Sequence, residues 1–299
     1  MPDQNNYMQN TQHKAGFVSI IGKPNAGKST LMNQLVGERL SIITSKAQTT
    51  RHRIMGIITG DDFQIVYSDT PGILAPQYKL QESMMKFVNA SLEDADMVIL
   101  VTDLGEKYDE DLLGRLQFIT SPIILLVNKV DLAKGSQAYD KVNYWKEVVP
   151  AAHYLEISAL TGQGVEELIH TIKELLPLHP PYFPDGDLTD KPEKFFASEI
   201  IREKILQNYK QEIPYSTEVV ISEFFKEEKI IRIRAEIYVE RKSQKGILIG
   251  KGGSSLKKVG IEARKDMEAF FQKQVHLETF VKIAENWRRE ERSIKRFGY

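Results

Sequence analysis

The 299-residue sequence contains no cysteine, and this absence excludes several functional classes. Without thiols there can be no disulfide framework, no thiolate nucleophile and no sulfur-based metal site, and the six histidines match no zinc spacing. Long apolar runs are also missing: the longest are short segments such as 123–127, against the roughly 18 to 20 residues of a membrane-spanning helix. The first dozen residues are polar and have no signal-peptide core. We therefore expect a protein that stays in a reducing cytosol.

The net charge is close to zero, but the two parts of the chain differ in sign. The formal total is −1, whereas the residues from Glu193 onward include 23 Lys and Arg against 17 Asp and Glu, a net of +6. The remaining residues, with 17 basic and 24 acidic side chains, have a net charge of −7. A basic part joined to an acidic part predicts a polyanionic partner for the basic part, although a solvated charged surface gives the same count.

From Ala15 to about Leu176, apolar strand-like runs alternate with helix-like stretches. This alternation predicts an α/β domain with a mostly parallel, six-stranded sheet covered by helices on both faces. One pair should differ, because only Gly60-Asp61-Asp62 separates its strands, too short for a crossover helix, so these two are expected to be antiparallel. The clearest strands are residues 16–21, 54–59, 63–68, 97–102, 123–127 and 154–157.

The segment 177–192 contains five prolines and several aspartates, and it is predicted to be a linker because proline cannot continue a helix. It follows a domain at 15–176 and an amino-terminal extension at 1–14. The last part, 193–299, is predicted to be an α+β domain with a basic tail. Its expected elements are a helix at 193–209, strands at 218–225 and 230–238, a glycine turn at 250–253, a helix at 254–271 and a strand at 275–283.

Directly after the first predicted strand comes GKPNAGKS, which matches the P-loop pattern in the required strand, loop and helix context. Its glycines let successive backbone N–H groups surround phosphate oxygens at the start of the next helix. We expect Lys28 to reach the terminal phosphates and Ser29 to give its hydroxyl to Mg²⁺. The residues predicted to line the phosphates are Gly22, Lys23, Pro24, Asn25, Ala26, Gly27, Lys28, Ser29 and Thr30.

A later strand ends in the motif Asp69-Thr70-Pro71-Gly72. An acid at the carboxyl end of a strand points into the crevice where ligands bind, so Asp69 is predicted to hold Mg²⁺ through water. Gly72 allows its N–H to approach a terminal phosphate, a contact that hydrolysis would remove. The same four residues also form an ordinary turn, and their position after the P-loop favours the nucleotide interpretation.

Two further motifs, NKVD and SAL, predict recognition of guanine. The Asp131 carboxylate can accept two hydrogen bonds from the guanine ring N–H and amino group, whereas adenine offers neither there. Asn128 should tie the base to the loop, Lys129 should cover its face, and a backbone N–H near Ala159 should donate to the guanine carbonyl. The residues expected around the base are Asn128, Lys129, Asp131, Ser158, Ala159 and Leu160.

The basic part contains the segment Gly250 to Gly253, which fits the GxxG loop of a KH domain. Such a loop clamps the sugar-phosphate backbone of about four nucleotides while the bases lie in an adjacent apolar groove. Eight basic residues and one acidic residue lie between Arg241 and Lys265. Groove candidates are Ile247, Leu248, Ile249, Val259 and Ile261, although most of these are also core candidates. The predicted RNA-binding residues are Arg241, Lys242, Ile249, Gly250, Lys251, Gly252, Gly253, Lys257 and Lys258.

Together, the nucleotide motifs resemble those of translation-factor-type GTPases, and QTTRH, residues 48–52, resembles the first switch of the Era family. The order of elements in the basic part resembles a type II KH domain. The family resemblance implies GTP or GDP with Mg²⁺, a potassium ion near Asn25, and binding near the 3′ end of small-subunit ribosomal RNA during subunit assembly. It also implies a cytoplasmic monomer with peripheral contact at the inner face of the cell membrane.

Two details of the mechanism follow from the resemblance. The threonine that meets Mg²⁺ is expected to be Thr50, with Thr49 as the alternative. Ile73 stands where Ras-like GTPases have the glutamine that orients the attacking water, so hydrolysis should depend on Lys28, Thr50, Gly72 and Mg²⁺ and be slow. The loops 41–50 and 72–79 are expected to reorganise with the γ-phosphate.

Two rival functions remain open from the sequence. One is a P-loop metabolic phosphotransferase whose basic domain is a substrate lid, and NKVD speaks against it. The other is a constitutive RNA-binding module whose nucleotide site is only structural.

Overall fold

The structure is a computed structural model that describes residues 13–110, 114, 116 and 119–299. The chain divides into two compact units. Of the described residues, the first unit contains those up to Ser41 together with those in 50–75 and 84–190, and the second contains 42–49, 76–83 and 191–299. Most of the amino-terminal extension expected at 1–14 lies outside the described residues. Among the described helices, none combines the length and hydropathy needed to cross a bilayer.

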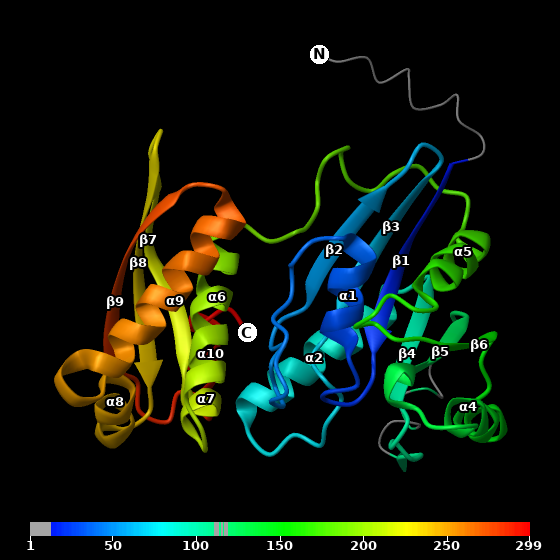
Figure 1. The fold of residues 1–299 in the computed structure, drawn as a ribbon, viewed down its shortest axis with the longest axis horizontal. Coiled ribbons are helices and arrows are strands. Elements are labelled where there is room, and N and C mark those ends of the chain that lie inside the picture. Colours follow the sequence, from blue (N-terminus) through cyan, green and yellow to red (C-terminus); the bar gives the residue numbers. More distant parts are fainter. Residues whose placement is uncertain (1–12, 111–113, 115, 117–118) are drawn as a thin grey trace. The chain divides into compact units, whose positions relative to one another are not determined.

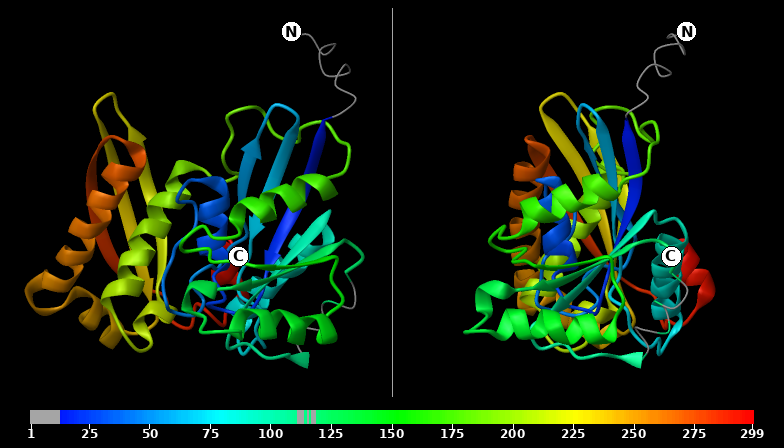
Figure 2. Two further views of the ribbon diagram at one scale, coloured as in Figure 1. Left: turned by 45° about the vertical axis from the view of Figure 1, so that its right-hand side comes forward. Right: turned by 90° about the vertical axis from the view of Figure 1, so that its right-hand side faces the viewer.

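The first unit is built on a six-stranded sheet in the order β2-β3-β1-β4-β5-β6, with helices on both faces (Figures 1 and 2). All pairs are parallel except β2 with β3, which confirms the expected fold class and the single antiparallel pair. The central strands β4 and β5 are buried along nearly their whole length, as a sheet covered on both faces requires. The strands are β1 (Lys14–Ile21), β2 (Ile54–Thr59), β3 (Phe63–Asp69), β4 (Met97–Asp103), β5 (Ile123–Asn128) and β6 (His153–Glu156).

The helices of this unit connect the strands in the way that parallel pairing demands. The phosphate and base motifs all follow strands, so they meet at the carboxyl edge of the sheet. The described elements are α1 (Lys28–Val36), α2 (Lys79–Glu93), the short 3₁₀ helix η1 (Val130–Leu132), α4 (Gln137–Val148) and α5 (Val165–Leu175).

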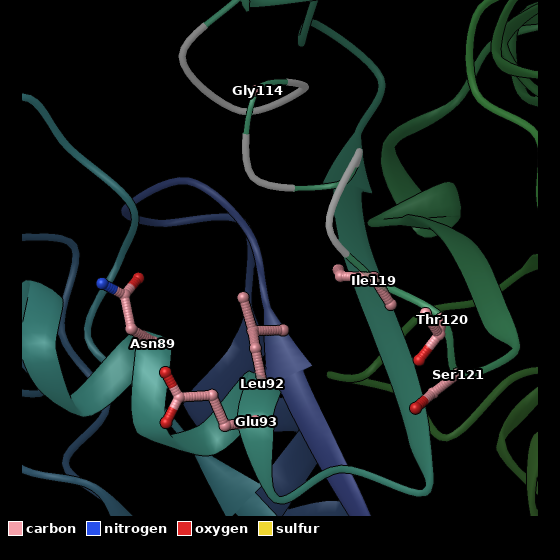
Figure 3. A pocket seen from close by; sticks show the side chains of 7 residues that line it. All are labelled: Asn89, Leu92, Glu93, Gly114, Ile119, Thr120 and Ser121. Carbon is pink, nitrogen blue, oxygen red and sulfur yellow. The ribbon is translucent and has the colours of Figure 1, made fainter.

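A pocket of about 540 Å³ lies at the opposite edge of the sheet, between α2 and the residues that precede β5 (Figure 3). None of the predicted nucleotide motifs contributes to it. Its lining residues are Asn89, Leu92, Glu93, Gly114, Ile119, Thr120 and Ser121.

The proline-rich segment predicted to be a linker is an ordered strap on the first unit as far as Asp190. The Ile57 N–H donates to the Leu188 carbonyl at 2.9 Å, which extends the β2 edge of the sheet. The fully buried Gln64 side chain accepts from the N–H groups of Tyr182 (2.7 Å) and Phe183 (3.0 Å) and donates to the Phe183 carbonyl (2.9 Å). The expected boundary at 177 therefore moves to about residue 190.

The second unit has a three-stranded sheet in the order β7-β8-β9, in which β7 pairs antiparallel and β9 pairs parallel with β8. Helices α6 and α9 pack on one face of it around a core of aliphatic side chains (Figure 1). The elements are α6 (Glu193–Asn208), α7 (Ile213–Ser216), β7 (Glu218–Lys226), β8 (Ile230–Val239), α8 (Lys242–Ile249), η2 (Lys251–Gly253), α9 (Ser254–Phe271), β9 (Gln274–Ile283) and α10 (Glu291–Arg296).

Every expected element of this unit is present, and the helices α7, α8 and α10 are additions. Residues 246–249, directly before the glycine turn, form the last turn of α8. Apart from the short helices α7 and η2, the element order with α8 is α-β-β-α-α-β, followed by the short α10.

We predict that Gln64→Leu releases the strap, because the N–H groups of Tyr182 and Phe183 lose their acceptor. The free energy of unfolding should fall by about 1–3 kcal/mol, and protease cleavage within 177–190 should become faster. Urea titration and limited proteolysis measure the two effects. Gln163→Leu, at an exposed position, is the matched control. Cleavage at the wild-type rate would show that Gln64 does not hold the strap.

Candidate nucleotide and RNA-binding sites

The loop between β1 and α1 has the backbone geometry of an anion cradle. Gly22 (φ 147°), Asn25 (φ 66°) and Gly27 (φ 102°) all have positive φ values. A Cβ atom at Gly27 would lie 2.2 Å from the Asn128 amide nitrogen, so only glycine fits there. Because the turn leads directly into α1, its N–H groups and the helix amino terminus face the same point.

Lys28 is the buried cation of this loop. Its Nζ donates to the carbonyls of Gly22 (3.1 Å) and Lys23 (2.9 Å), which direct the ammonium group along the loop. Burial lowers the pKa of Lys28 to about 8, and the carboxylates of Asp69 and Glu106 oppose this shift. An ammonium group with so little water around it gains strongly from a phosphate oxygen.

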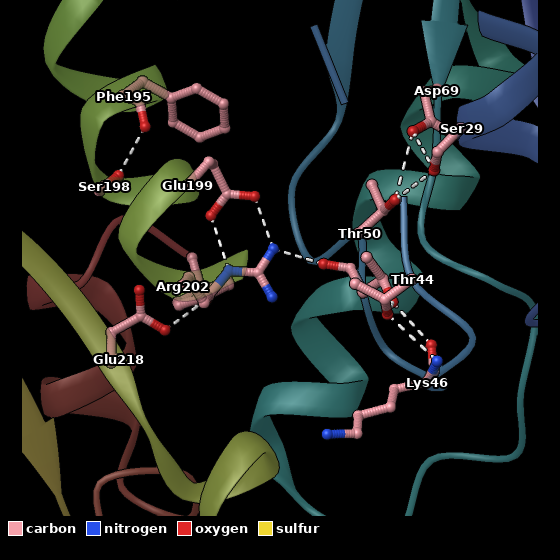
Figure 4. A network of polar contacts seen from close by, with 12 residues as sticks. Ser29, Thr44, Lys46, Thr50, Asp69, Phe195, Ser198, Glu199, Arg202 and Glu218 are labelled. Atoms are coloured by element: carbon pink, nitrogen blue, oxygen red, sulfur yellow. Dashed lines mark hydrogen bonds and ion pairs between the residues drawn. The ribbon is translucent and has the colours of Figure 1, made fainter. Parts of the chain in front are cut away.

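Three oxygen atoms gather where β3 ends. Asp69 Oδ2 accepts hydrogen bonds from Ser29 Oγ (2.8 Å) and Thr50 Oγ1 (3.2 Å), and these two hydroxyls are 2.8 Å apart (Figure 4). Asp69 is fully buried, and its Oδ1 atom has no hydrogen-bond partner among the described residues. Burial raises the pKa of Asp69, while Lys28 and the neighbouring hydroxyls act in the opposite direction.

This donor set fits Mg²⁺. Hydroxyl and carboxylate oxygens are its preferred ligands, and a divalent cation would compensate the buried charge and the unpartnered Oδ1 of Asp69. No group of three or more His, Asp or Glu side chains gathers within the described residues, so phosphate oxygens would have to complete the shell. Thr50 belongs to this set. Thr49 does not, because its hydroxyl contacts Thr44 Oγ1 at 2.8 Å and the Lys46 carbonyl at 2.6 Å.

Gly72 packs directly against the phosphate loop. A Cβ atom there would lie 2.7 Å from the Pro24 nitrogen, and the next residue, Ile73, donates its N–H to the Gly22 carbonyl at 3.0 Å. Thr70 Oγ1 donates to the Ile20 carbonyl at 2.8 Å, which fixes the motif at the end of β3. The Ile73 side chain is buried and apolar, so it cannot orient a water molecule by hydrogen bonding.

The base motifs also meet the phosphate loop. The Asn128 side chain donates to the Ala26 carbonyl (2.8 Å) and accepts from the Ala159 N–H (2.9 Å), so one buried amide joins three loops. Lys129 Nζ donates to the Asn25 carbonyl at 2.7 Å, and Ser158 Oγ donates to Asp131 Oδ1 at 2.5 Å. The Ala159 N–H is thus engaged by protein, and the predicted donor to the guanine carbonyl must be a neighbouring amide.

The sequence analysis missed two acids of this site. Asp103 Oδ2 accepts a hydrogen bond from Lys129 Nζ at 2.9 Å, and burial raises the pKa of Glu106 to about 7 against the opposing charges of Lys23 and Lys28. Asp103 is the last residue of β4. The rule that an acid at the carboxyl end of a strand points toward the ligand, which singled out Asp69, could therefore have found Asp103 as well. Nothing local marks Glu106.

In the second unit, the glycine loop lies between α8 and α9. Gly250 (φ 72°), Gly252 (φ 58°) and Gly253 (φ 81°) have left-handed backbones, which favours glycine at each. A Cβ atom at Gly250 would lie 2.2 Å from Ser255 Oγ, whereas Gly252 and Gly253 have open space around them. The outer part of the loop can therefore be approached closely by a ligand.

Several basic side chains lie near that loop. Some of the other basic side chains of this unit are neutralised, for example Lys204 by Asp266 and Arg288 by Glu240. Lys258 has only the distant Glu262, at 3.8 Å. Within the described part of the chain, five exposed or half-buried basic residues near the loop have no ion-pair partner: Arg241, Lys242, Lys245, Lys251 and Lys257.

Two of the groove candidates belong to the core. Leu248 and Val259 are fully buried within the aliphatic cluster, so they cannot contact bases. Ile249 is only partly buried beside Gly250. Ile247 and Ile261 are 52% and 42% exposed and remain available to a ligand.

Comparison with known proteins gives matches over both units. A family model described as a 50S ribosome-binding GTPase matches residues 17–129, and a KH domain model matches residues 212–288. GTPase Era of Staphylococcus epidermidis is 43% identical over 293 residues, which cover 97% of this chain and 98% of that protein.

Two solved structures of Era are similar along nearly the whole chain. One is Era in complex with MgGDPNP and nucleotides 1506–1542 of 16S ribosomal RNA, and the other is an Aquifex aeolicus Era variant bound to GDP and AlF₄⁻. Each is 36% identical with a TM-score of 0.91, and each alignment covers 96% of this chain and 99% of the other.

We predict that Mg²⁺ alone, without nucleotide, raises the thermal midpoint of the wild-type protein, because it compensates the buried Asp69 charge. Asp69→Asn should abolish this response and raise the metal-free stability by about 1–3 kcal/mol, since the uncompensated charge is gone. Differential scanning calorimetry at several MgCl₂ concentrations measures both effects. Asp103→Asn, at a half-buried position, should keep the Mg²⁺ response. A wild-type midpoint that is independent of Mg²⁺ would contradict the prediction.

Proposed function

Because this chain belongs to the Era family of GTPases, we propose that it hydrolyses GTP and binds the 3′ end region of small-subunit ribosomal RNA during assembly of the small subunit. The proposal rests on two features that one chain combines. One is the group of loops suited to a guanine nucleotide, and the other is a glycine loop surrounded by basic side chains without ion-pair partners. The Era structure with MgGDPNP and ribosomal RNA nucleotides 1506–1542 has both ligands on a protein of the same architecture.

The phosphate loop and the β3 end carry the hydrolytic site. Mg²⁺, when bound, withdraws electron density from the phosphate oxygens and neutralises the charge that develops during transfer. Ser29, Thr50 and Asp69 would hold it, and Lys28 would neutralise the terminal phosphates. The Gly72 N–H would approach the γ-phosphate, close to Pro24. The buried, apolar Ile73 cannot take the place of the water-orienting glutamine, so we expect slow intrinsic turnover.

Specificity for guanine rests on Asp131 and its neighbours. Asp131 would accept hydrogen bonds from the guanine ring N–H and amino group, while Ser158 holds the carboxylate in position. Since the Ala159 N–H is bound to Asn128, the Leu160 amide is the proposed donor to the guanine carbonyl. This carboxylate would be left unpaired by ATP, which disfavours the phosphotransferase alternative.

The basic unit is the RNA-binding part. Its unpaired cations and the open glycines Gly252 and Gly253 suit contact with a sugar-phosphate backbone, and Lys251 places charge within the loop. The exposed side chains of Ile247 and Ile261 are the apolar surface on which bases would lie. Single-stranded RNA is favoured over duplex, because a GxxG loop requires bases that are free to turn outward.

Four further parts of the proposal come from the family resemblance. Potassium would bind near Asn25, whose backbone is already left-handed in the phosphate loop. The protein would act as a cytoplasmic monomer with peripheral contact at the inner face of the membrane.

We predict that Asp131→Asn lowers the affinity for GTP and admits xanthosine nucleotides, because the amide donates where xanthine has a carbonyl. The loss should be on the order of 10²-fold or more for GTP. Competition of GTP and XTP against a fluorescent GDP analogue measures the change. Asp140→Asn, on the exposed surface of α4, is the control. An unchanged preference for GTP would remove Asp131 from base recognition.

We predict that Gly252→Asp weakens RNA binding by about tenfold or more and leaves GDP affinity unchanged, because it places a negative charge beside the RNA phosphates. The new side chain meets no neighbouring atom, so the fold should persist apart from a strained backbone at φ 58°. Filter binding with labelled RNA and calorimetry with GDP separate the two affinities. Gly135→Asp, at another open left-handed glycine, is the control. Equal RNA affinity would contradict the KH assignment.

A further inference from the structure

Helix α6 is buried on almost all sides, although its sequence is rich in charge. Glu199, Arg202, Glu203 and Lys204 are each less than 9% exposed. Charged side chains in such a helix need specific partners, because uncompensated burial is costly. The partners of these charged side chains show which segments of the protein the helix holds in place.

One end of the contact network is the segment 42–49, which lies in the same compact unit as α6. The Arg202 guanidinium donates to the Thr49 carbonyl, and Glu199 holds that guanidinium through two hydrogen bonds, the longer of which is 2.7 Å (Figure 4). The next residue along the chain is Thr50, whose hydroxyl lies 2.8 Å from Ser29 Oγ. The carbonyl that Arg202 holds is therefore one peptide unit away from the proposed Mg²⁺ ligand.

A second contact joins the same segment to the carboxyl end of α6. Lys46 Nζ donates to the carbonyls of Leu206 and Tyr209. The last carbonyls of a helix have no partner within the helix, and a cation there also interacts favourably with the helix dipole. Lys46 thus acts as a cap for α6, provided by a residue 160 positions away from Leu206 in the sequence.

Tyr209 connects this helix end to the glycine loop. Its buried hydroxyl donates to the Leu248 carbonyl at 2.6 Å and also lies beside the Ser255 hydroxyl. Leu248 precedes the loop Gly250–Gly253, and Ser255 follows it. One phenolic oxygen therefore contacts both ends of a loop whose glycines offer no side chains of their own.

We propose that Tyr209 is a positioning residue for the RNA-binding loop and that Lys46, by capping α6 beside Tyr209, makes RNA affinity respond to the nucleotide loop. The inference rests on the proposed function and specifies how that RNA site is regulated. In this proposal, neither Lys46 nor Tyr209 touches the nucleotide or the RNA. A movement of Thr50 with the γ-phosphate reaches the loop through segment 42–49, the α6 end and the Tyr209 hydroxyl.

The first test is Tyr209→Phe, which removes one hydroxyl and keeps the ring in the core. RNA affinity should fall about three- to tenfold, the worth of one or two hydrogen bonds, while GDP affinity stays at the wild-type value. A single-stranded oligonucleotide of the small-subunit rRNA 3′ end is the probe, measured by fluorescence anisotropy. Ser255→Ala should weaken RNA binding in the same direction. Tyr238→Phe, whose hydroxyl contacts Glu236 on β8, is the matched control.

The second test measures the ratio of RNA affinities with GDPNP and with GDP. Lys46→Met should bring this ratio close to one, Lys46→Arg should restore it, and Lys295→Met, at an exposed lysine that pairs with Glu291, should leave it unchanged. In the double variant of Lys46→Met with Tyr209→Phe, the changes in RNA affinity that the two substitutions cause should not add. Both substitutions act on the same path of contacts.

The outcomes separate the inference from the proposed function. Wild-type protein that binds no such RNA would overturn the proposed function itself. Wild-type RNA binding with an unchanged affinity in Tyr209→Phe would overturn only the positioning role. A wild-type ratio of one, or a ratio that Lys46→Met does not change, would overturn the link between the nucleotide loop and the RNA loop.

Discussion

The burial of one carboxylate, Asp69, is the constraint on which the nucleotide site depends. Its position is set by sheet register, since it pairs with Ile20 in β1 and with Ile54 in β2. Two hydroxyls contact one of its oxygens, while the other has no partner among the described residues. The fold thus buries the negative charge of Asp69 at a cost in free energy. A bound cation with its phosphate ligands would compensate that cost. Thr50, which follows the segment 42–49, also contacts this carboxylate, so a metal ion bound there would interact with the end of that segment.

The nucleotide site could be predicted from the sequence largely because its motifs are local. Each one follows an apolar strand, and the carboxyl ends of parallel strands meet at one edge whatever the details of the helices. The same reasoning predicted the single antiparallel pair from the short turn at 60–62. This reasoning could not predict the contacts between motifs. Asn128, predicted to hold the base, also accepts a hydrogen bond from the Ala159 N–H, and a tetrapeptide pattern cannot show such competition.

The failures of sequence analysis have a common physical cause, which is a polar side chain whose partner lies far along the chain. Five prolines predicted a linker, but they could not show that Gln64, more than a hundred residues earlier, holds this segment as a strap. Helix α8 was missed because Gln244 occupies a core position, where it accepts hydrogen bonds from the N–H groups of Glu240 and Arg241. On α6, Arg202 and Lys204 are buried, and their partners include the Thr49 carbonyl and Asp266, which lie far along the chain. Apolar periodicity carries no information about such satisfied polar groups.

The two anion-binding loops of this protein share one structural problem and solve it in the same way. Glycine gives the close approach that phosphate requires, but it also removes the side chains that would fix the loop. In the phosphate loop the missing anchor is supplied by Asn128, which reaches the Ala26 carbonyl from the end of β5. In the RNA loop it is supplied by Tyr209, which reaches the Leu248 carbonyl from the end of α6. A motif therefore identifies the loop, while control over it belongs to a residue outside the motif, and that residue is where a second ligand can act.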